Sequence, residues 1–196
     1  VIPFLDQLTL EAEKTQSVNT IYLNGDQIVG HNTDIEGFEI SIKKSKSDLS
    51  NQEVLILGAG GVVPSIIYAL NKMKVSKIIV SNRTKDKAKN LNSLFNNLNI
   101  IEWGEVPSFD MVINATSLGL KEKDKINLEF SSIGKNKFFY DVIYNPKETN
   151  FLKTGKNLGN ITLNGKLMFI YQALSAFYIW HRLKPDINED VIKLLD

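Results

Sequence analysis

The segment Val54–Val63, with the sequence VLILGAGGVV, constrains the fold of this chain more than any other segment. Four apolar residues lead into a glycine cluster, and a second apolar periodicity follows it. This order is typical of a buried parallel strand, a tight turn and a helix whose N-terminus can hold a phosphate. The alternative is an ordinary strand–turn–helix corner. We favour a dinucleotide site because alternating strands and helices continue after it.

From Glu53 to Leu163, apolar strands alternate with helical segments. We expect strands at 54–57, 77–81, 100–103, 111–114, 138–143 and 161–163, with helices at 62–72, at 85–98 and from 146 to just before 159. Such regular alternation indicates an α/β fold with a doubly wound parallel sheet. Two further helices, at 166–181 and 187–195, lie outside the alternation.

The residues before Glu53 follow a different pattern. We expect a helix over Pro3–Ser17, with Thr9 as a capping residue. Two short strands, at 18–23 and 27–30, flank Asn24-Gly25, a dipeptide typical of type I′ hairpin turns. Asn32-Thr33-Asp34 then predicts the start of another helix.

Composition excludes several classes of function. A hydrophobic content of 43% with 23% charged residues is typical of globular proteins, and the net charge of +1 gives no case for binding nucleic acid or an anionic membrane. The longest apolar run, Leu167–Trp180, is too short to span a bilayer. The chain has no cysteine, so we expect no disulfide and no cysteine-based metal site, and we assign no metal ligands. The absence of cysteine fits a reducing cytosol, so we expect a cytoplasmic protein.

The chain begins with valine, in the middle of an apolar pattern. We therefore expect that an N-terminal portion of the protein precedes Val1.

A basic turn refines the choice of cofactor. NAD-binding proteins usually end the second strand of this unit with Asp or Glu, which holds the ribose hydroxyls. Here that place holds Asn82-Arg83-Thr84, with Lys85 and Lys87 behind it. Arginine recognises phosphate with a permanent charge and two parallel hydrogen bonds. The turn therefore favours NADP, and a solvated basic turn is the alternative.

Three polar residues are candidates for a substrate site. Asp34 is a candidate acid–base group, with a helix cap as its alternative role. Gln172 lies on an otherwise apolar helix, where a buried amide needs either backbone partners or a polar ligand. Tyr144 lies at the C-terminal end of a predicted strand, where open α/β sheets bind ligands.

Taken together, these motifs resemble the shikimate dehydrogenase family over essentially the whole chain. The resemblance rests on the following segments: Val18-Asn19-Thr20, Asn32-Thr33-Asp34, Gly58-Ala59-Gly60-Gly61, Asn82-Arg83-Thr84, Asn114-Ala115-Thr116-Ser117-Leu118-Gly119, Tyr140-Asp141-Val142-Ile143-Tyr144-Asn145-Pro146 and Gln172-Ala173. It implies NADPH-dependent reduction of 3-dehydroshikimate to shikimate, in the biosynthesis of chorismate and aromatic amino acids. It also implies a monomer or homodimer acting on a small molecule.

The resemblance implies a Rossmann-like domain inserted between two parts of a smaller α/β substrate domain. We expect residues 35–164 to form the NADP-binding domain, and residues 1–34 and 165–196 to be what this chain holds of the substrate domain.

The resemblance also assigns site residues. Asp34 is expected to be catalytic and to bind substrate, together with Asn19, Tyr144 and Gln172. The expected cofactor-binding residues are Gly58, Ala59, Gly60, Gly61, Val62, Asn82, Arg83, Thr84, Lys85, Lys87, Thr116, Ser117, Val142 and Gly165.

Two departures from the family pattern stand out. The segment Gly165-Lys166-Leu167-Met168 stands where the family usually has Gly-Leu-Gly-Met. A larger residue therefore replaces the second glycine, which affects the nicotinamide end. The family's catalytic lysine lies in an Asn-Val-Thr-x-Pro-Phe-Lys motif upstream of Val1, and Leu5 stands where Val1-Ile2-Pro3-Phe4 would place it.

Three functional hypotheses follow from these observations. The first is a shikimate dehydrogenase. The second is a related dehydrogenase that acts on quinate or another polyol acid. The third, which we favour for residues 1–196 taken alone, is an NADP-binding module without turnover.

Overall fold

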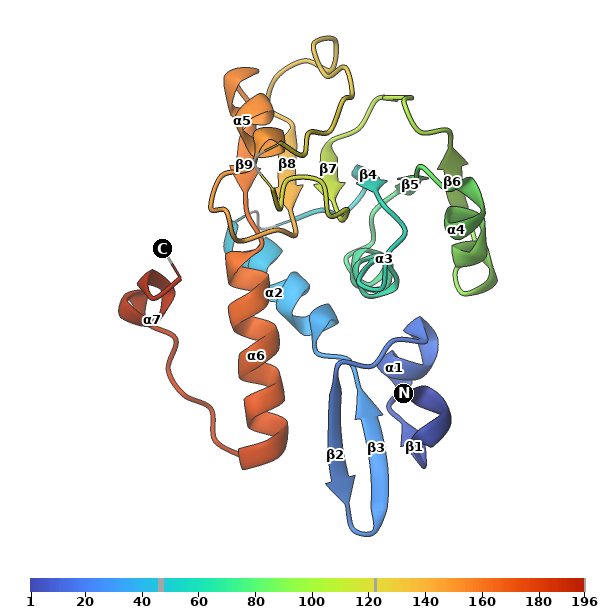
Figure 1. Ribbon diagram of the computed structural model, residues 1–196, viewed down its shortest axis with the longest axis vertical. Coiled ribbons are helices and arrows are strands. Elements are labelled where there is room, and N and C mark those ends of the chain that lie inside the picture. Colours follow the sequence, from blue (N-terminus) through green and yellow to red (C-terminus); the bar gives the residue numbers. More distant parts are fainter. Residues whose placement is uncertain (46–47, 122, 196) are drawn as a thin grey trace.

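The computed structural model describes residues 1–45, 48–121 and 123–195 (Figure 1). In these residues the chain forms a six-stranded sheet and a separate three-stranded sheet, with helices packed against them. The larger sheet carries the glycine segment, so it is described first.

The six strands of the larger sheet are all parallel. They are β4 (Glu53–Leu57), β5 (Lys77–Ser81), β6 (Leu98–Ile101), β7 (Met111–Asn114), β8 (Phe138–Asp141) and β9 (Ile161–Leu163). Their order in the sheet is β6-β5-β4-β7-β8-β9. The first three strands in sequence therefore run outward in one direction and the last three in the other, which is the strand order of dinucleotide-binding Rossmann folds. The predicted doubly wound parallel sheet is confirmed.

Successive side chains of the strands point to opposite faces of the sheet and pack into two separate hydrophobic cores. In β4, Val54 and Ile56 face a core shared with helices α2 (Asp34–Ser45), α3 (Val63–Lys72) and α4 (Lys85–Asn90). Leu55 and Leu57 face the other core, where Phe139 and Phe151 pack at a centroid separation of 5.1 Å. Helix α5 (Asn150–Asn157) covers that second face. Burial on both faces explains why β4 is a continuous apolar run.

The smaller sheet contains β1 (Gln7–Leu8), β2 (Thr20–Asn24) and β3 (Gln27–His31) in the order β1-β3-β2. The helix predicted over Pro3–Ser17 was wrong. The residues 3–17 do not form one helix but a 3₁₀ turn (Ile2–Phe4), then β1, then α1 (Leu10–Thr15) capped by Thr9. Pairing of β1 with β3 overrides the local helical pattern.

The hairpin turn was placed one residue too early. Asn24 pairs with Gln27, so the turn residues are Gly25 and Asp26. Gly25 has a φ of 62° and Asp26 has a negative φ, as in a type II′ turn rather than the expected type I′ turn.

Four elements of the larger sheet and its helices differ in their bounds from the prediction. The helix expected over 85–98 ends at Asn90 and continues as a 3₁₀ turn (Leu91–Ser93), and β6 starts at residue 98 rather than 100. The strand expected over 138–143 ends at Asp141, because the next residues turn back and the Ile143 amide donates to the Asp141 carboxylate. The helix expected to start at Pro146 starts at Asn150, capped by Thr149, and a cis Asn145–Pro146 bond precedes it.

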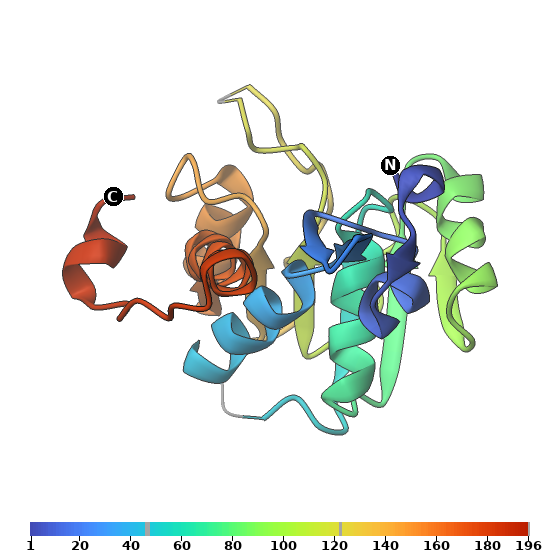
Figure 2. The same ribbon diagram turned by 90° about the horizontal axis from the view of Figure 1, so that it is seen from below.

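The C-terminal part packs back onto α2. Helix α6 (Lys166–His181) runs beside α2, and α7 (Glu189–Lys193) follows it (Figures 1 and 2). The two helices approach closely at Gly37, where an added Cβ would lie 2.7 Å from the carbonyl oxygen of Met168. Helix α2 also contacts α3. The proposed division into residues 1–34 with 165–196 and residues 35–164 therefore falls at the first turn of α2.

Candidate functional site

The glycine turn after β4 has open space beside it. Gly58 has a φ of 113°, and a Cβ there would lie 2.7 Å from the carbonyl oxygen of Ala115, so the turn itself requires this glycine. At Gly60 an added Cβ would meet nothing closer than 3.9 Å, and at Gly61 nothing within 4 Å. Packing within the protein does not explain these two glycines, whereas close approach of a ligand to the backbone does.

The backbone amides of this turn are available to an anion. In the described residues, the amides of Gly60, Gly61 and Val62 donate no backbone hydrogen bond. They stand at the N-terminus of α3, where unpaired N–H groups and the helix dipole favour negative charge. The turn therefore fits the pyrophosphate of a dinucleotide, as the sequence predicts.

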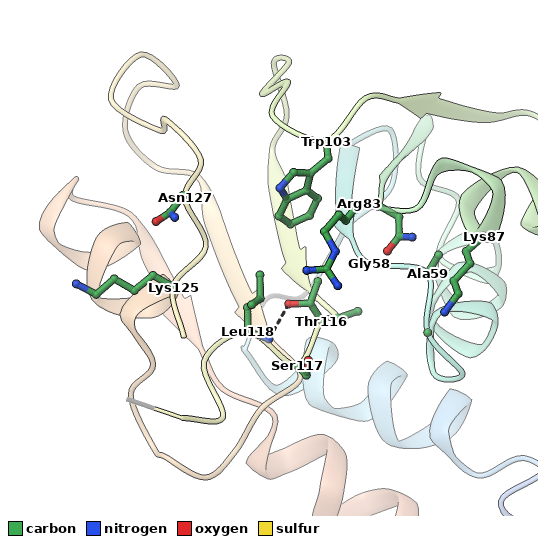
Figure 3. A pocket seen from close by; sticks show the side chains of 13 residues that line it. Gly58, Ala59, Arg83, Lys87, Trp103, Thr116, Ser117, Leu118, Lys125 and Asn127 are labelled. Carbon is green, nitrogen blue, oxygen red and sulfur yellow. Dashed lines mark hydrogen bonds between the residues drawn. The ribbon is translucent and has the colours of Figure 1, made fainter. Parts of the chain in front are cut away.

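A cavity of about 490 Å³ opens beside this turn, at the C-terminal ends of the parallel strands (Figure 3). Its walls come from the turns after β4 and β5, the residues after β6, the loop after β7 and the segment that follows that loop. The lining residues are Gly58, Ala59, Gly60, Asn82, Arg83, Lys87, Trp103, Ala115, Thr116, Ser117, Leu118, Lys125 and Asn127.

Only some residues of the basic turn and the helix after it line this cavity. Arg83 and Lys87 line it, and the exposed guanidinium of Arg83 projects into it (Figure 3). Thr84 and Lys85 do not line it, and Lys85 instead pairs with Glu102. The structure thus brings Arg83 and Lys87 to the expected phosphate site, and places Thr84 and Lys85 beside it.

Two further cavities extend the first. One, of about 510 Å³, shares Ala115, Thr116 and Ser117 with the cofactor cavity and adds Val142 and Tyr144. The other, of about 280 Å³, shares Val62, Val142 and Tyr144 with the second and adds the substrate candidates. The lining residues of this third cavity are Asn19, Asp34, Val62, Val142, Tyr144, Gly165, Met168, Phe169 and Gln172. Because neighbouring cavities share lining residues, the three lie next to one another. We call this row of cavities the channel and the third the substrate-end cavity.

Asp34 lies in the substrate-end cavity as the first residue of α2. The backbone amide of Asp34 donates a hydrogen bond to Asn32 Oδ1 at 3.0 Å, so Asn32 satisfies the start of the helix. The carboxylate of Asp34 is therefore not needed as a cap. Burial raises the pKa of Asp34, and a hydrogen bond from Asn19 partly opposes this rise.

The orientation of Asn19 follows from its neighbours. Its Oδ1 accepts hydrogen bonds from the Thr20 hydroxyl at 3.0 Å and from the Thr33 amide and hydroxyl at 2.9 and 3.1 Å. With the oxygen held by these donors, the side-chain NH₂ is directed to the Asp34 carboxylate and the cavity. Asn19 and Asp34 thus form a fixed pair with complementary donors and acceptors.

Gln172 and Tyr144 complete the substrate-end cavity. The Nε2 of Gln172 donates to the Phe169 carbonyl at 3.0 Å, and its Oε1 accepts from the Thr33 hydroxyl at 3.4 Å. Gln172 therefore has a backbone partner and also lines the cavity, so both roles considered from the sequence apply. Tyr144 stacks on Phe169 with ring centroids 4.5 Å apart. This stack gives the cavity an apolar wall opposite its polar pair.

Gly165 and Val142 meet at the junction between the larger sheet and α6. A Cβ at Gly165 would overlap the carbonyl oxygen of Val142, so a side chain cannot be accommodated there. Both residues lie at the substrate-end cavity rather than in the cofactor cavity, as does Val62. Lys166 and Leu167, where the chain departs from the family pattern, are not among the residues that line it.

A buried carboxylate links two walls of the channel. Asp141 is fully buried and accepts hydrogen bonds from Asn114 Nδ2 at 3.0 Å, the Ile143 amide at 3.0 Å and the Thr149 hydroxyl at 2.6 Å. The Oδ1 of Asn114 accepts from the amide and hydroxyl of Thr116. Burial raises the pKa of Asp141 to about 6, although its three hydrogen bonds favour the ionised form.

Several residues of the channel were missed from sequence. Trp103 follows β6 at the strand edge that carries Arg83, and the rule that ligands bind at the carboxyl ends of strands could have identified it. Lys125 and Asn127 come from a segment without periodicity, and nothing in its pattern signals their position. Phe169 and Met168 were assigned to an apolar helix, which they also belong to.

The described residues contain no group of three or more His, Cys, Asp or Glu side chains arranged to hold a metal ion. No described helix combines the length and hydropathy required to cross a membrane.

The sequence matches the family model described as shikimate / quinate 5-dehydrogenase over residues 41–147. A shikimate dehydrogenase (NADP(+)) from Pelagibacter ubique (strain HTCC1062) is 58% identical over 196 residues, which are 100% of this chain and 74% of that protein.

Solved structures agree with the fold. The crystal structure of shikimate dehydrogenase from Aquifex aeolicus has a TM-score of 0.86 at 33% identity, over 99% of this chain and 71% of that one. Quinate dehydrogenase from Corynebacterium glutamicum in complex with NAD has a TM-score of 0.87 at 29% identity, over 100% of this chain and 71% of that one. The chain belongs to the shikimate/quinate 5-dehydrogenase family.

Proposed function

We propose that this protein is an NADP-dependent shikimate dehydrogenase, which interconverts 3-dehydroshikimate and shikimate in aromatic amino-acid biosynthesis. The observation that carries the proposal is the row of adjoining cavities from Arg83 to Asp34. A phosphate-binding turn lies at one end, and a polar pair suited to a polyhydroxylated acid lies at the other. The relative with 58% identity, a shikimate dehydrogenase (NADP(+)), supports the same reaction.

The cofactor cavity fits NADP. The open glycine turn suits a pyrophosphate, and Arg83 and Lys87 suit a 2′-phosphate, since both cations line the cavity and no acidic side chain lines it among the described residues. When bound, the cofactor supplies the hydride chemistry. Thr116 and Ser117 line the passage from this cavity toward the substrate end.

At the substrate end, the residues orient the reacting molecule. Asp34 accepts hydrogen bonds from hydroxyl groups, the Asn19 side-chain NH₂ offers donors, and the Gln172 amide adds a further polar group. The Tyr144–Phe169 stack excludes water from one side. Fixed geometry of this kind converts binding into rate, because the reacting carbon must face the cofactor cavity.

The substrate-end cavity offers few side chains that could transfer a proton. Among the described residues, the lining of the substrate-end cavity contains the carboxyl of Asp34 and the phenol of Tyr144, and it contains no lysine. The proposed role of Asp34 is to hold and charge-pair the acid–base group of the active protein. Residues 1–196 taken alone therefore fit an NADP-binding module without turnover.

A quinate-type specificity is the second candidate. Its support is the match to a combined shikimate / quinate model and the similarity to a quinate dehydrogenase structure. Quinate carries one more hydroxyl than shikimate, so the polar pair Asn19 and Asp34 is compatible with either acid.

Steady-state kinetics test these proposals. Oxidation of shikimate and of quinate is measured with NADP⁺ and with NAD⁺, by the absorbance of the reduced cofactor. For the active protein we expect kcat/KM to be highest for shikimate with NADP⁺, by about tenfold over each other combination. A preference for quinate would support the second candidate. For residues 1–196 taken alone, binding of NADP⁺ by calorimetry without turnover of either acid would support the binding module, and turnover as fast as that of the active protein would contradict it.

Three coarser expectations stay proposals. A cytoplasmic location rests on the need for an intracellular nicotinamide cofactor. The oligomeric state, monomer or homodimer, and the division into residues 35–164 and the two flanking parts are supported only by the family resemblance.

A further inference from the structure

Trp103 has no place in the function described so far, although it lines the cofactor cavity. It follows β6, which pairs with β5 in a register that puts Ile101 opposite Ser81. Two residues beyond that pair, Trp103 stands beside Arg83 at the same edge of the sheet. The side chains of both residues project into one cavity (Figure 3).

The position of Trp103 is fixed through the preceding residue, Glu102. The Ser81 hydroxyl donates to the Glu102 carbonyl at 3.1 Å, and Lys85 pairs with the Glu102 carboxylate. Both contacts tie the turn after β6 to the turn that carries Arg83. Trp103 is half-buried, with one side against the core formed by Phe109, Phe130 and their neighbours. An indole held in this way presents a rigid aromatic surface to the cavity.

We propose that Trp103 forms the adenine-binding wall of the cofactor cavity, next to the 2′-phosphate site at Arg83. A base stacks favourably on an indole whatever the base, because every base presents a flat aromatic face. Arg83 supplies charge for the phosphate, and Trp103 supplies apolar surface for the ring. The inference rests on the proposed cofactor but not on the substrate.

The chain offers a matched pair of tryptophans for a direct test. Its two tryptophans are Trp103 and Trp180. Trp180 lies on α6, donates its Nε1–H to the Ile21 carbonyl at 2.9 Å and does not line the cofactor cavity. Trp180→Phe therefore leaves only the cavity tryptophan, and Trp103→Phe leaves only the remote one.

The probes are NADP⁺, adenosine 2′,5′-bisphosphate and nicotinamide mononucleotide, titrated while tryptophan fluorescence is recorded. In Trp180→Phe we expect saturable quenching by NADP⁺ and by the bisphosphate but not by the mononucleotide. In Trp103→Phe we expect at most a slight change. Calorimetry should show about tenfold weaker binding of the bisphosphate to Trp103→Ala and near-normal binding to Trp103→Phe, which keeps an aromatic ring.

The outcomes distinguish the adenine-binding role of Trp103 from the assignment of NADP as cofactor. If calorimetry shows NADP⁺ binding but Trp180→Phe is not quenched, or if folded Trp103→Ala binds the bisphosphate normally, the adenine wall is wrong and the cofactor assignment stands. If the unaltered chain does not bind NADP⁺ at all, the proposed function is contradicted and this inference with it.

Discussion

At the scale of single residues, the environment of Asp34 decides between its two possible roles. The sequence left it as a catalytic candidate or a helix cap. In the structure Asn32 makes the bond that a cap would make, and Asp34 faces the substrate-end cavity. Burial without a cationic partner among the described residues raises the pKa of this carboxyl. Such a group is costly to keep in a cavity unless a ligand or partner uses it.

Asp34→Asn should therefore lower kcat for shikimate by about a hundredfold in the active enzyme, because the amide cannot hold a charged acid–base group. Steady-state kinetics would measure this, with folding checked by circular dichroism. Glu36→Gln is the control: it removes a carboxylate from the same turn of α2, which bonds to Ser175 outside the channel, and kcat should be unchanged. A raised KM with normal kcat in Asp34→Asn would reduce Asp34 to a binding residue.

Sequence could identify the residue types of the site but not their mutual orientation. Asn19 and Thr33 stood in recognisable motifs. The hydrogen bonds that turn the Asn19 amide toward Asp34, however, depend on how the residue before β2 meets the residue before α2. Lys85 shows the reverse. Its place in a basic turn suggested a phosphate ligand, while a long-range pair with Glu102 takes it out of the cavity.

At the scale of elements, the loops after β7 and β8 are held together by one buried carboxylate. Asp141 bonds to Asn114, which in turn orients Thr116, and to Thr149, which caps α5. Local propensity could not reveal this link. It also explains the wrong ends predicted for β8 and α5, because the chain between them follows Asp141 and its partners rather than continuing a strand or starting a helix at Pro146.

The raised pKa of Asp141 predicts a specific dependence of stability on pH. Since the folded pKa, about 6, exceeds the ordinary value of 3.8, the folded state holds this proton more tightly than the unfolded state. The group's favourable contribution is complete below the unfolded pKa and is lost as pH rises through the folded pKa. Between pH 4.5 and 7.5 the contribution of Asp141 to the free energy of unfolding should fall by about 2 kcal/mol.

Asp141→Asn lacks this titration, so its free energy of unfolding relative to the unaltered chain should rise by about 2 kcal/mol over the same range. Urea unfolding at several pH values measures it. Asp26→Asn, in the exposed hairpin turn, is the control that allows general charge effects to be subtracted. A difference between Asp141→Asn and the unaltered chain that does not vary with pH would contradict the assignment.

At the scale of the whole molecule, the site exists because parallel strands end at one edge. The turns after β4 and β5, the residues after β6 and the loops after β7 and β8 are separated in sequence, yet all of them line the channel. The regular alternation of strands and helices was sufficient to predict this convergence. It was not sufficient to predict how α2 and α6 place the substrate residues beside the channel, since that depends on their close contact at Gly37.

The central claim is that these strand ends form one NADP site, with the 2′-phosphate at Arg83. Calorimetric titration of NADP⁺ and NAD⁺ into the unaltered chain, Arg83→Ala and Lys89→Ala tests it most directly. Lys89 is an exposed lysine of α4 that pairs with Asp86 and does not line the cavity. We predict that Arg83→Ala weakens NADP⁺ binding by about tenfold to a hundredfold and barely changes NAD⁺ binding, while Lys89→Ala alters neither. Equal weakening of both cofactors by Arg83→Ala would contradict the claim.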